Sequence, residues 1–269
     1  MQDKVHYSTL VLSDIHIGNS HSKTNEVIAF LNSISYDKLI LNGDIIDGWQ
    51  LQKNNVRWRK RYTRFFKTIM RLMEQQQTEI IYIRGNHDDF LDHFLPFQFS
   101  NFHIVKDYIH ESNSKQRYYV LHGDVFDLVS SHIRWLAMLG DMGYSFLLWV
   151  NKIYNKQRRK KGLPYHSMAQ IIKKKVKRAV SYLSDFEKEL VKLAKHRKFD
   201  GIICGHIHQA ENKWIDGIHY MNSGDWVESL TALAETTSGE WEIIRYEGLL
   251  DISPDSKEHE LSVLSQLEM

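Results

Sequence analysis

The stretch from Thr9 to His16 reads Thr-Leu-Val-Leu-Ser-Asp-Ile-His, an apolar run that ends in an aspartate and a histidine. A short apolar run bounded by polar residues is typical of a buried strand. Side chains in an extended segment alternate with a period of two, so Asp14 and His16 lie on the same side of the chain. A carboxylate and an imidazole placed in this way can both reach one bound ion.

The same pattern recurs four more times along the chain. Each apolar run is followed by a cluster of Gly, Asp, Asn or His: Lys38–Asn42 by Gly43-Asp44-Ile-Ile-Asp47, Glu79–Ile83 by Gly85-Asn86-His87-Asp88, Arg117–Leu121 by His122-Gly123-Asp124, and Gly201–Cys204 by Gly205-His206-Ile-His208. Ligand sites of α/β folds lie at the carboxyl ends of strands, so we expect the five clusters to meet at one site. The glycines at 43, 85, 123 and 205 would let the backbone turn sharply there.

Helical patterns alternate with these runs. Apolar residues recur at helical spacing over Thr24–Ile34 and Asn54–Gln76, and strands alternating with helices predict an α/β layered fold. Further strands are expected at Lys213–Met221, Leu230–Glu235 and Trp241–Arg245. The later part of the chain should therefore be richer in β-structure than a doubly wound sheet.

The composition limits the class of protein. The chain has 269 residues, of which 42% are hydrophobic and 25% charged, as in globular proteins and unlike disordered or fibrous ones. Only three prolines and no Gly/Ser-rich stretch offer a linker, so we expect one domain over residues 1–269. A single cysteine, Cys204, excludes a disulfide scaffold and a cysteine-built zinc site. The absence of an apolar signal-peptide core and of a membrane-spanning run predicts a cytoplasmic protein.

Positive charge is concentrated in one segment. Eleven lysines and arginines lie between Lys152 and Arg178, whereas no Asp or Glu occurs from residue 142 to residue 184. An apolar stretch rich in aromatic residues precedes them. We expect residues 128–184 to form a helical, basic and aromatic insertion that acts as a lid, accepts acyl chains and approaches the anionic surface of the inner membrane. The alternative is a helical hairpin with its own core and a solvated charged face.

Taken in order, the motifs Asp14-x-His16, Gly43-Asp44-x-x-Asp47, Gly85-Asn86-His87-Asp88, His122 and Gly205-His206-x-His208 resemble the signature of the calcineurin-like metallophosphoesterase superfamily. The resemblance implies a four-layer αββα sandwich and two divalent ions that share one aspartate. One ion would be bound by Asp14, His16, Asp44 and His208. The other would be bound by Asp44, Asn86, His122 and His206. Oxygen and nitrogen ligands suit manganese, iron, zinc or magnesium.

Two such cations about 3.5–4 Å apart activate a water and stabilise phosphoryl oxygens, which predicts a hydrolase of phosphoesters or pyrophosphates. His87 follows a metal ligand without being one, so it is the candidate catalytic residue that stabilises the phosphoryl group or protonates the leaving oxygen. Substrate contacts are expected from Asn86, His87, Asp127 and His206. Asp47 and Asp88 would not bind metal themselves but would orient the metal-binding histidines.

The substrate is suggested by two further features. The insertion and the segment Asn222-Ser-Gly-Asp-Trp-Val-Glu228 are similar to the UDP-2,3-diacylglucosamine diphosphatases of lipid A synthesis, which cleave a pyrophosphate in a nucleotide-linked glycolipid, usually with manganese. This resemblance implies manganese and a lipid-linked phosphorylated substrate. The sequence itself shows no sign of an obligate protein partner. His87 departs from the best-characterised branch of that family, which has arginine at this point of the motif.

Two alternatives remain open at this stage. A phosphodiesterase or nuclease is the first, because the run Arg57-Trp-Arg-Lys-Arg61 can contact phosphates. A non-catalytic metal-binding scaffold is the second. Such a scaffold would be expected to lack one or more ligands, whereas all of them are present in this chain.

Overall fold

The computed structural model describes residues 4–53, 57–126, 158 and 183–246. The chain divides into two compact units, one of Met1–Asp124 with Val191–Met269 and the other of Val125–Leu190. Asp127 and nearly all of the expected insertion at 128–184 lie outside the described residues. The lid, and the single domain over residues 1–269, therefore stay predictions.

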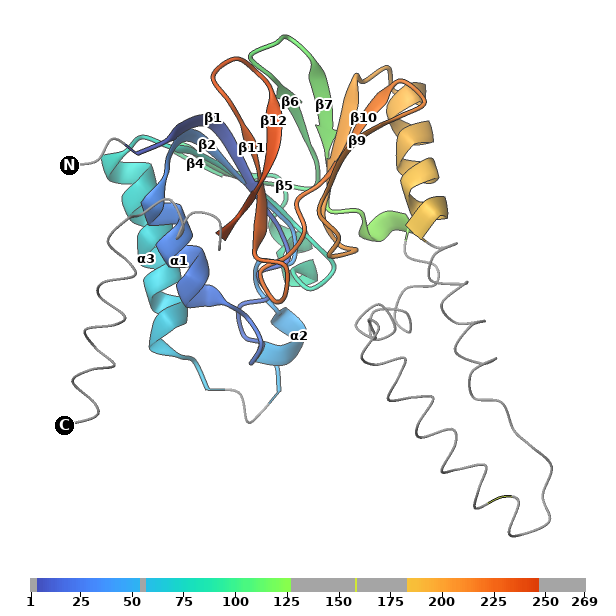
Figure 1. Ribbon diagram of the computed structural model, residues 1–269. Helices are drawn as coiled ribbons and strands as arrows, with labels where there is room; N and C mark the ends of the chain where they lie inside the picture. The colour runs from blue at the N-terminus through green and yellow to red at the C-terminus, as the bar shows by residue number, and fades with distance from the viewer. Residues whose placement is uncertain (1–3, 54–56, 127–157, 159–182, 247–269) are drawn as a thin grey trace. The chain divides into compact units, whose positions relative to one another are not determined.

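Two mixed sheets form the centre of the first unit (Figure 1). The seven-stranded sheet has the order β12-β11-β1-β2-β3-β5-β4, and its strands are β1 (His6–Leu12), β2 (Ser35–Asn42), β3 (Glu79–Ile83), β4 (Phe97–Phe99), β5 (Phe102–Val105), β11 (Thr231–Glu235) and β12 (Trp241–Arg245). The five-stranded sheet has the order β6-β7-β8-β10-β9, and its strands are β6 (Tyr108–Glu111), β7 (Arg117–Val120), β8 (Gly201–Cys204), β9 (Glu211–Ile215) and β10 (Ile218–Asn222). Strands β1, β2 and β3 run parallel, as do β7 and β8. Their carboxyl ends therefore point the same way within each sheet.

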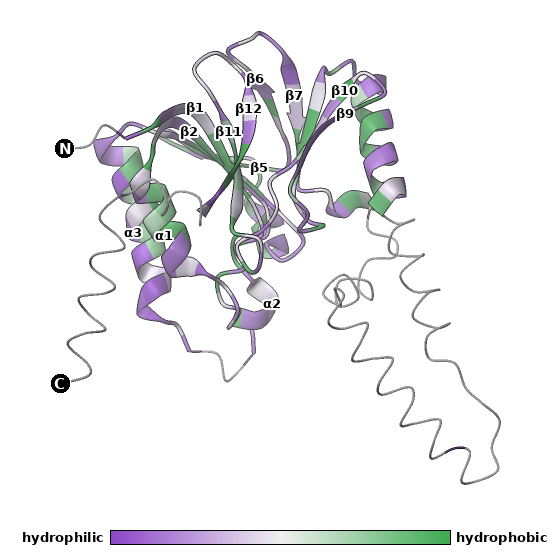
Figure 2. Ribbon diagram, viewed as in Figure 1, coloured by the Kyte–Doolittle hydropathy of each residue, from purple (hydrophilic) through white to green (hydrophobic). Residues whose placement is uncertain are grey.

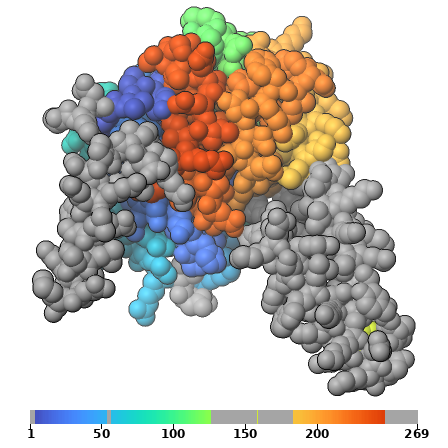
Figure 3. All heavy atoms as spheres, in the orientation of Figure 1, coloured from blue at the N-terminus to red at the C-terminus, as the bar shows by residue number. Residues whose placement is uncertain are grey.

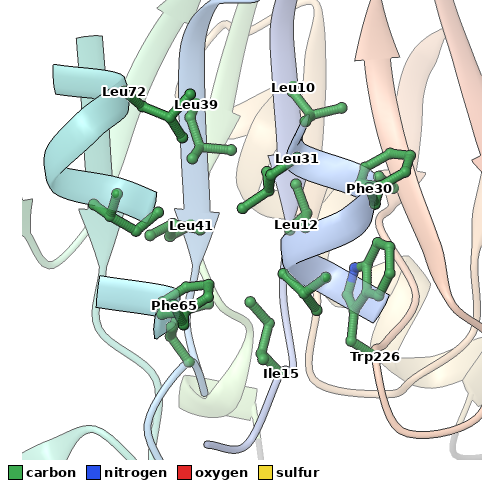
Figure 4. Packing of buried hydrophobic residues seen from close by; sticks show 14 of the residues in the cluster. Leu10, Leu12, Ile15, Phe30, Leu31, Leu39, Leu41, Phe65, Leu72 and Trp226 are labelled. Atoms are coloured by element: carbon green, nitrogen blue, oxygen red, sulfur yellow. The ribbon is translucent and has the colours of Figure 1, made fainter. Parts of the chain in front are cut away.

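Alternation along the central strands produces two apolar layers. Leu10 and Leu12 of β1 pack against α1 (Thr24–Ser33) and α3 (Lys60–Gln75), together with Phe30 and Leu31 of α1 (Figure 4). Val11, between them, faces the opposite way and packs with Ile40, Val120 and Ile203 in the core between the sheets. Figure 2 shows apolar residues concentrated on the central strands, while α3 carries hydrophilic residues. This is the pattern expected when one sheet is buried on both faces.

The second sheet is covered by a helix as well. The end of a helix, residues 191–196, belongs to the first unit and lies beside this sheet in Figure 1, and its residues Val191 and Ala194 are buried. The layers are therefore helix, sheet, sheet and helix, and the prediction of an αββα sandwich is confirmed. Figure 3 shows the β9–β10 and β11–β12 hairpins side by side, where the Asn212 amide donates a 2.7 Å hydrogen bond to the Trp241 carbonyl.

Three details differ from the sequence-based expectation. Residues 213–221 are not one strand but parts of β9 and β10, joined by a turn in which Asp216 and Gly217 have φ values of 49° and 81°. Asp-Gly is a preferred pair for such a hairpin turn. The described part of the second helix begins at Lys60, because Arg59 is extended. Strands β4, β5 and β6 were not expected. None of the described helices is long and apolar enough to cross a membrane.

Candidate metal centre

Loops from both sheets bring the expected polar side chains to one place. Asp14 and His16 follow β1, and Asp44 follows β2; the Asp14 N–H donates to the Gly43 carbonyl (3.0 Å) and the His16 N–H to the Asp44 carbonyl (2.8 Å). His206 follows β8, and its N–H donates to Asp14 Oδ2 (2.9 Å). Ligand atoms within 4.8 Å of one another then form two clusters, Asp14 with His16 and His208, and Asp44 with His122 and His206.

Asp44 lies between the two clusters. One of its carboxylate oxygens is 3.4 Å from His122 Nε2 and the other is 3.7 Å from His16 Nε2. Asp14 makes the corresponding contacts only within the first cluster, with His208 Nε2 at 3.0 Å and His16 Nε2 at 3.7 Å. Of these two carboxylates, Asp44 is therefore the one whose oxygens lie within 4 Å of an imidazole nitrogen from each cluster.

Asn86 and His87 follow β3, and the peptide between them lies beside the same carboxylate. The His87 N–H donates to Asp44 Oδ1 (2.8 Å), which places the Asn86–His87 peptide beside Asp44. His87 Nε2 lies 3.9 Å from Asp44 Oδ2, and a third group of possible ligand atoms consists of His16, Asp44 and His87. Asp127, the remaining residue expected to contact substrate, lies outside the described part of the chain.

The donor atoms fit a divalent cation. Among the described residues, the buried atoms of these side chains that have no hydrogen-bond partner include Asp14 Oδ1, His16 Nε2, Asp44 Oδ2, Asn86 Oδ1 and His122 Nε2. A buried polar atom without a partner costs about 1–3 kcal/mol, so several in one place need an explanation. Cations bound by this oxygen and nitrogen set would satisfy them.

The backbone of the centre is strained. Five residues of the two clusters have left-handed φ values, namely Asp14 (53°), His16 (52°), Asp44 (53°), His206 (69°) and His208 (57°). Non-glycine residues rarely adopt this conformation, and it concentrates at functional sites where the surrounding structure enforces it. The loops therefore aim these side chains at a cost in local stability.

Two glycines allow the loops to approach so closely. A Cβ at Gly43, whose φ is 82°, would lie 2.4 Å from the ring of His122. A Cβ at Gly85 would lie 2.3 Å from Asp44 Oδ1. Gly85 thus serves close packing rather than the sharp turn expected from the sequence, because no left-handed φ accompanies it.

Buried polar groups hold the ligands in position. The Asn42 carbonyl accepts a hydrogen bond from His122 Nδ1 (3.0 Å), which directs His122 Nε2 toward Asp44, and the Asn42 amide donates to the Leu121 carbonyl (3.1 Å). The Asn222 amide likewise donates to the Gly205 carbonyl (2.7 Å). This role of the two asparagines was not predicted from the sequence. The signal in the sequence that could have predicted it is an asparagine at the end of an otherwise apolar strand.

Asp47 and Asp88 play different parts. Asp47 Oδ1 lies 3.0 Å from His87 Nδ1, and Asp47 Oδ2 lies 3.9 Å from His16 Nδ1, in keeping with the expectation that Asp47 orients histidines. Asp88 instead accepts hydrogen bonds from the backbone N–H groups of Ile45, Ile46 and Gly85 and from the Tyr82 hydroxyl. These contacts hold the loop around Asp44 rather than a histidine. Burial, reinforced by the charge of Asp44, raises the pKa of Asp88 to about 7.

The segment from Asn222 to Glu228 forms a turn. Asp225 accepts hydrogen bonds from the N–H groups of Val227 and Glu228, and Trp226 is fully buried against Phe30, with ring centroids 5.0 Å apart. Asp225 and Trp226 therefore stabilise the loop after β10.

The metal-free centre favours positive charge. Burial disfavours a charged imidazole, but the carboxylate of Asp44 outweighs it and raises the pKa of His122 to about 10. Burial also disfavours the ionised carboxylate of Asp44, yet His122 and His16 hold the pKa of Asp44 well below its usual range. Near neutral pH, a proton on His122 thus occupies the place that a cation would take.

Metal binding is therefore expected to release a proton. His122 is charged in the metal-free fold and has an ordinary pKa near 6.5 when unfolded, so its stabilising contribution is complete below about pH 6.5 and is lost as the pH rises through about 10. A cation at Nε2 must displace that proton. Calorimetric titration with Mn²⁺ at pH 7.5, in buffers of different ionisation enthalpy, should show release of about one proton per chain. His122→Asn should remove this release, and heats that do not depend on the buffer would contradict the expectation.

The chain is similar to one known protein family and to several solved structures. Residues 7–210 match the family described as calcineurin-like phosphoesterase. No curated protein sequence matches the chain. Among solved structures, a phosphodiesterase from an archaeon is similar, with 14% identity, 88% of this chain and 98% of that chain covered, and a TM-score of 0.44. The phosphoesterase YfcE from E. coli has 16% identity, coverage of 90% and 94%, and a TM-score of 0.44. Vps29 from Entamoeba histolytica, complexed with zinc, has 13% identity, coverage of 88% and 98%, and a TM-score of 0.38.

Proposed function

The chain belongs to the calcineurin-like phosphoesterase family and is a metal-dependent phosphoesterase; on that premise we propose that it hydrolyses a phosphodiester or pyrophosphate bond with two divalent ions. The observation that carries the proposal is the position of Asp44. Its two oxygens lie 3.4 Å from His122 and 3.7 Å from His16, so one carboxylate adjoins both clusters. A ligand shared by two ions requires this arrangement.

Seven side chains would hold the ions. The first ion would be bound by Asp14, His16, Asp44 and His208. The second would be bound by Asp44, Asn86, His122 and His206. We propose manganese as the metal. The oxygen and nitrogen donors also suit iron, zinc and magnesium, so these are the other outcomes of a metal analysis. When bound, such ions activate water and stabilise charge on phosphoryl oxygens.

His87 would act on the substrate. Its Nδ1 lies 3.0 Å from Asp47 Oδ1, and its Nε2 faces Asp44 at 3.9 Å. Asp47 thus fixes the ring while the Nε2 edge borders the candidate centre. From this edge, His87 would donate a hydrogen bond to the phosphoryl group or a proton to the leaving oxygen. Asn86 and His206 would contact the same phosphoryl group.

Replacing His87 by alanine is expected to lower kcat by about 100- to 10,000-fold, the usual contribution of a positioned proton donor. Two ions per chain should remain bound, because His87 is not among the proposed ligands. Turnover of bis-p-nitrophenyl phosphate and elemental analysis of the same sample measure both quantities. The exposed His93 offers a matched control, and His93→Ala should retain full turnover. Unchanged kcat in His87→Ala would reject the catalytic role of His87.

The proposed substrate is a nucleotide-linked one, with UDP-2,3-diacylglucosamine as the specific candidate. Support comes from the likeness in sequence to diphosphatases of that glycolipid, together with the expected insertion at 128–184. The buried turn around Trp226 gives no support of its own, since Asp225 and Trp226 are engaged within the fold. Small phosphodiesters and nucleic acid are the rival substrates.

One experiment separates these substrates. Protein loaded with manganese is incubated with UDP-2,3-diacylglucosamine, with UDP-glucose, with bis-p-nitrophenyl phosphate and with single-stranded DNA. Turnover that requires the acyl chains supports the lipid substrate. Equal turnover of UDP-glucose and the small diester removes it, and DNA cleavage that weakens steeply with salt indicates a nuclease. A parallel sedimentation with anionic liposomes tests the proposed approach to a membrane surface.

A further inference from the structure

Two exposed aromatic side chains border His87. Trp49 lies on the short helix α2 (Gly48–Leu51), labelled in Figure 1, and is 47% exposed. Phe90 lies in the 3-10 helix η1 (Asp89–Phe94), just after the His87 loop, and is 37% exposed. Ligand sites are commonly lined by hydrophobic and aromatic side chains together with a few polar groups.

The indole of Trp49 is held against the imidazole of His87. Their ring centroids are 4.1 Å apart, with an angle of 36° between the planes, and Trp49 Nε1 lies 3.4 Å from Asp89 Oδ2. Trp226, by contrast, is fully buried in the core. Trp49 is therefore about half exposed to solvent while its ring contacts the proposed catalytic residue, His87.

Gly48 brings Phe90 to the same turn. A Cβ at Gly48 would lie 2.8 Å from the ring of Phe90 and 2.8 Å from the His87 carbonyl, so this turn packs tightly on both. The Gly48 N–H also donates to the His87 carbonyl (3.0 Å). The loop after β2 and the loop after β3 thus hold Gly48, the residue before Trp49, against both His87 and Phe90.

We propose that Trp49 and Phe90 form an aromatic subsite that stacks the base of a nucleotide whose phosphate lies at the metal centre. The inference deepens the proposed function and rests on it for the position of the phosphate. Stacking tolerates different bases because every base has a π-face. The subsite would therefore select nucleotides over sugar phosphates without distinguishing purines from pyrimidines.

The test compares affinities of ligands that differ only in the base. AMP, UMP and ribose 5-phosphate are titrated into manganese-loaded protein by calorimetry. AMP and UMP should bind about 5- to 150-fold more tightly than ribose 5-phosphate, the equivalent of about 1–3 kcal/mol for one stacked base. Trp49→Ala should abolish most of this ratio, and Trp49→Phe should restore a large part of it.

Trp58→Ala is the matched control. Trp58 is also exposed, at 54%, but it packs against Phe66 of α3, with ring centroids 6.1 Å apart. Its removal should leave the ratio unchanged. If Trp49 only positioned His87, its removal would alter the turnover of all substrates equally and would not change the ratio of nucleotide affinity to ribose 5-phosphate affinity. An unchanged affinity ratio in Trp49→Ala therefore overturns the subsite.

The subsite and the proposed function fail in different ways. Equal affinity for AMP and ribose 5-phosphate, with bis-p-nitrophenyl phosphate still hydrolysed, overturns the subsite alone. A base preference that depends on Trp49, in a protein that hydrolyses none of the phosphodiesters and pyrophosphates tested, overturns the proposed function and leaves the subsite standing.

Discussion

Replacing Asp44 by asparagine is expected to lower turnover by at least about 1,000-fold and to reduce bound metal below two ions per chain. Asparagine offers one neutral oxygen in place of a carboxylate with two, so it cannot serve both clusters. Loss of one of two cations removes several kcal/mol of transition-state stabilisation, and each 1.36 kcal/mol is a factor of ten in rate. Turnover of bis-p-nitrophenyl phosphate and elemental analysis of the purified protein measure the two effects.

Asparagine also serves as a control for folding. Its Oδ1 can still accept the hydrogen bond from the His87 N–H, so the loop around residue 44 should persist, as circular dichroism can check. Asp37 has a side chain that is 74% exposed, and Asp37→Asn should change neither metal content nor turnover. Full turnover of Asp44→Asn, or full turnover of the natural protein with a single ion, would contradict the two-ion proposal.

Replacing Gly85 by alanine is expected to reduce both stability and metal content. The new Cβ would lie 2.3 Å from Asp44 Oδ1 and 2.4 Å from the Asp44 nitrogen, so the loop must shift. Overpacking of this kind costs about 1–3 kcal/mol in the free energy of unfolding. Because Asp44 is the residue displaced, the affinity for at least one ion should fall as well. Denaturant unfolding and a metal titration on the same preparation test both effects.

Gly217→Ala is the control that separates a steric clash of the new Cβ from the energetic cost of placing alanine in a left-handed backbone conformation. Gly217 has a φ of 81°, and nothing lies within 4 Å of the Cβ that alanine would add. Alanine there should cost about 1 kcal/mol through the left-handed backbone and leave metal binding unchanged. A Gly85→Ala protein that binds two ions with natural affinity would show that the Asp44 loop has more freedom than its contacts indicate.

The principal strands and the meeting of their loops follow from the sequence. The runs before Asp14 and Asp44 have the apolar character of strands buried on both faces, and the polar residues come where such strands must end. Parallel pairing then leaves little choice about where these side chains gather. The order of the motifs therefore contains most of the information about where the candidate centre lies.

Other features depend on contacts that no local pattern records. Strands β4 to β6 are exposed or half-buried over most of their length, so they lack the buried apolar run that marks β7 and β8. The Asp216-Gly217 pair marks a turn in the sequence, but the apolar residues on both sides read as one strand. The partners of Asp88 and the ring contact between Trp49 and His87 arise from the approach of two loops about 40 residues apart in the sequence. Only the packing of the sheets determines this approach.

The two clusters draw their side chains from both sheets. Asp14, His16 and Asp44 follow strands of the seven-stranded sheet, whereas His122, His206 and His208 follow strands of the five-stranded sheet. Each bound cation would thus link loops of the two sheets, as a disulfide links two segments of a chain. Ions that bind only the assembled pair of sheets add their binding free energy to the stability of the whole fold. Removal of the metal would then lower the stability of the fold as well as the activity.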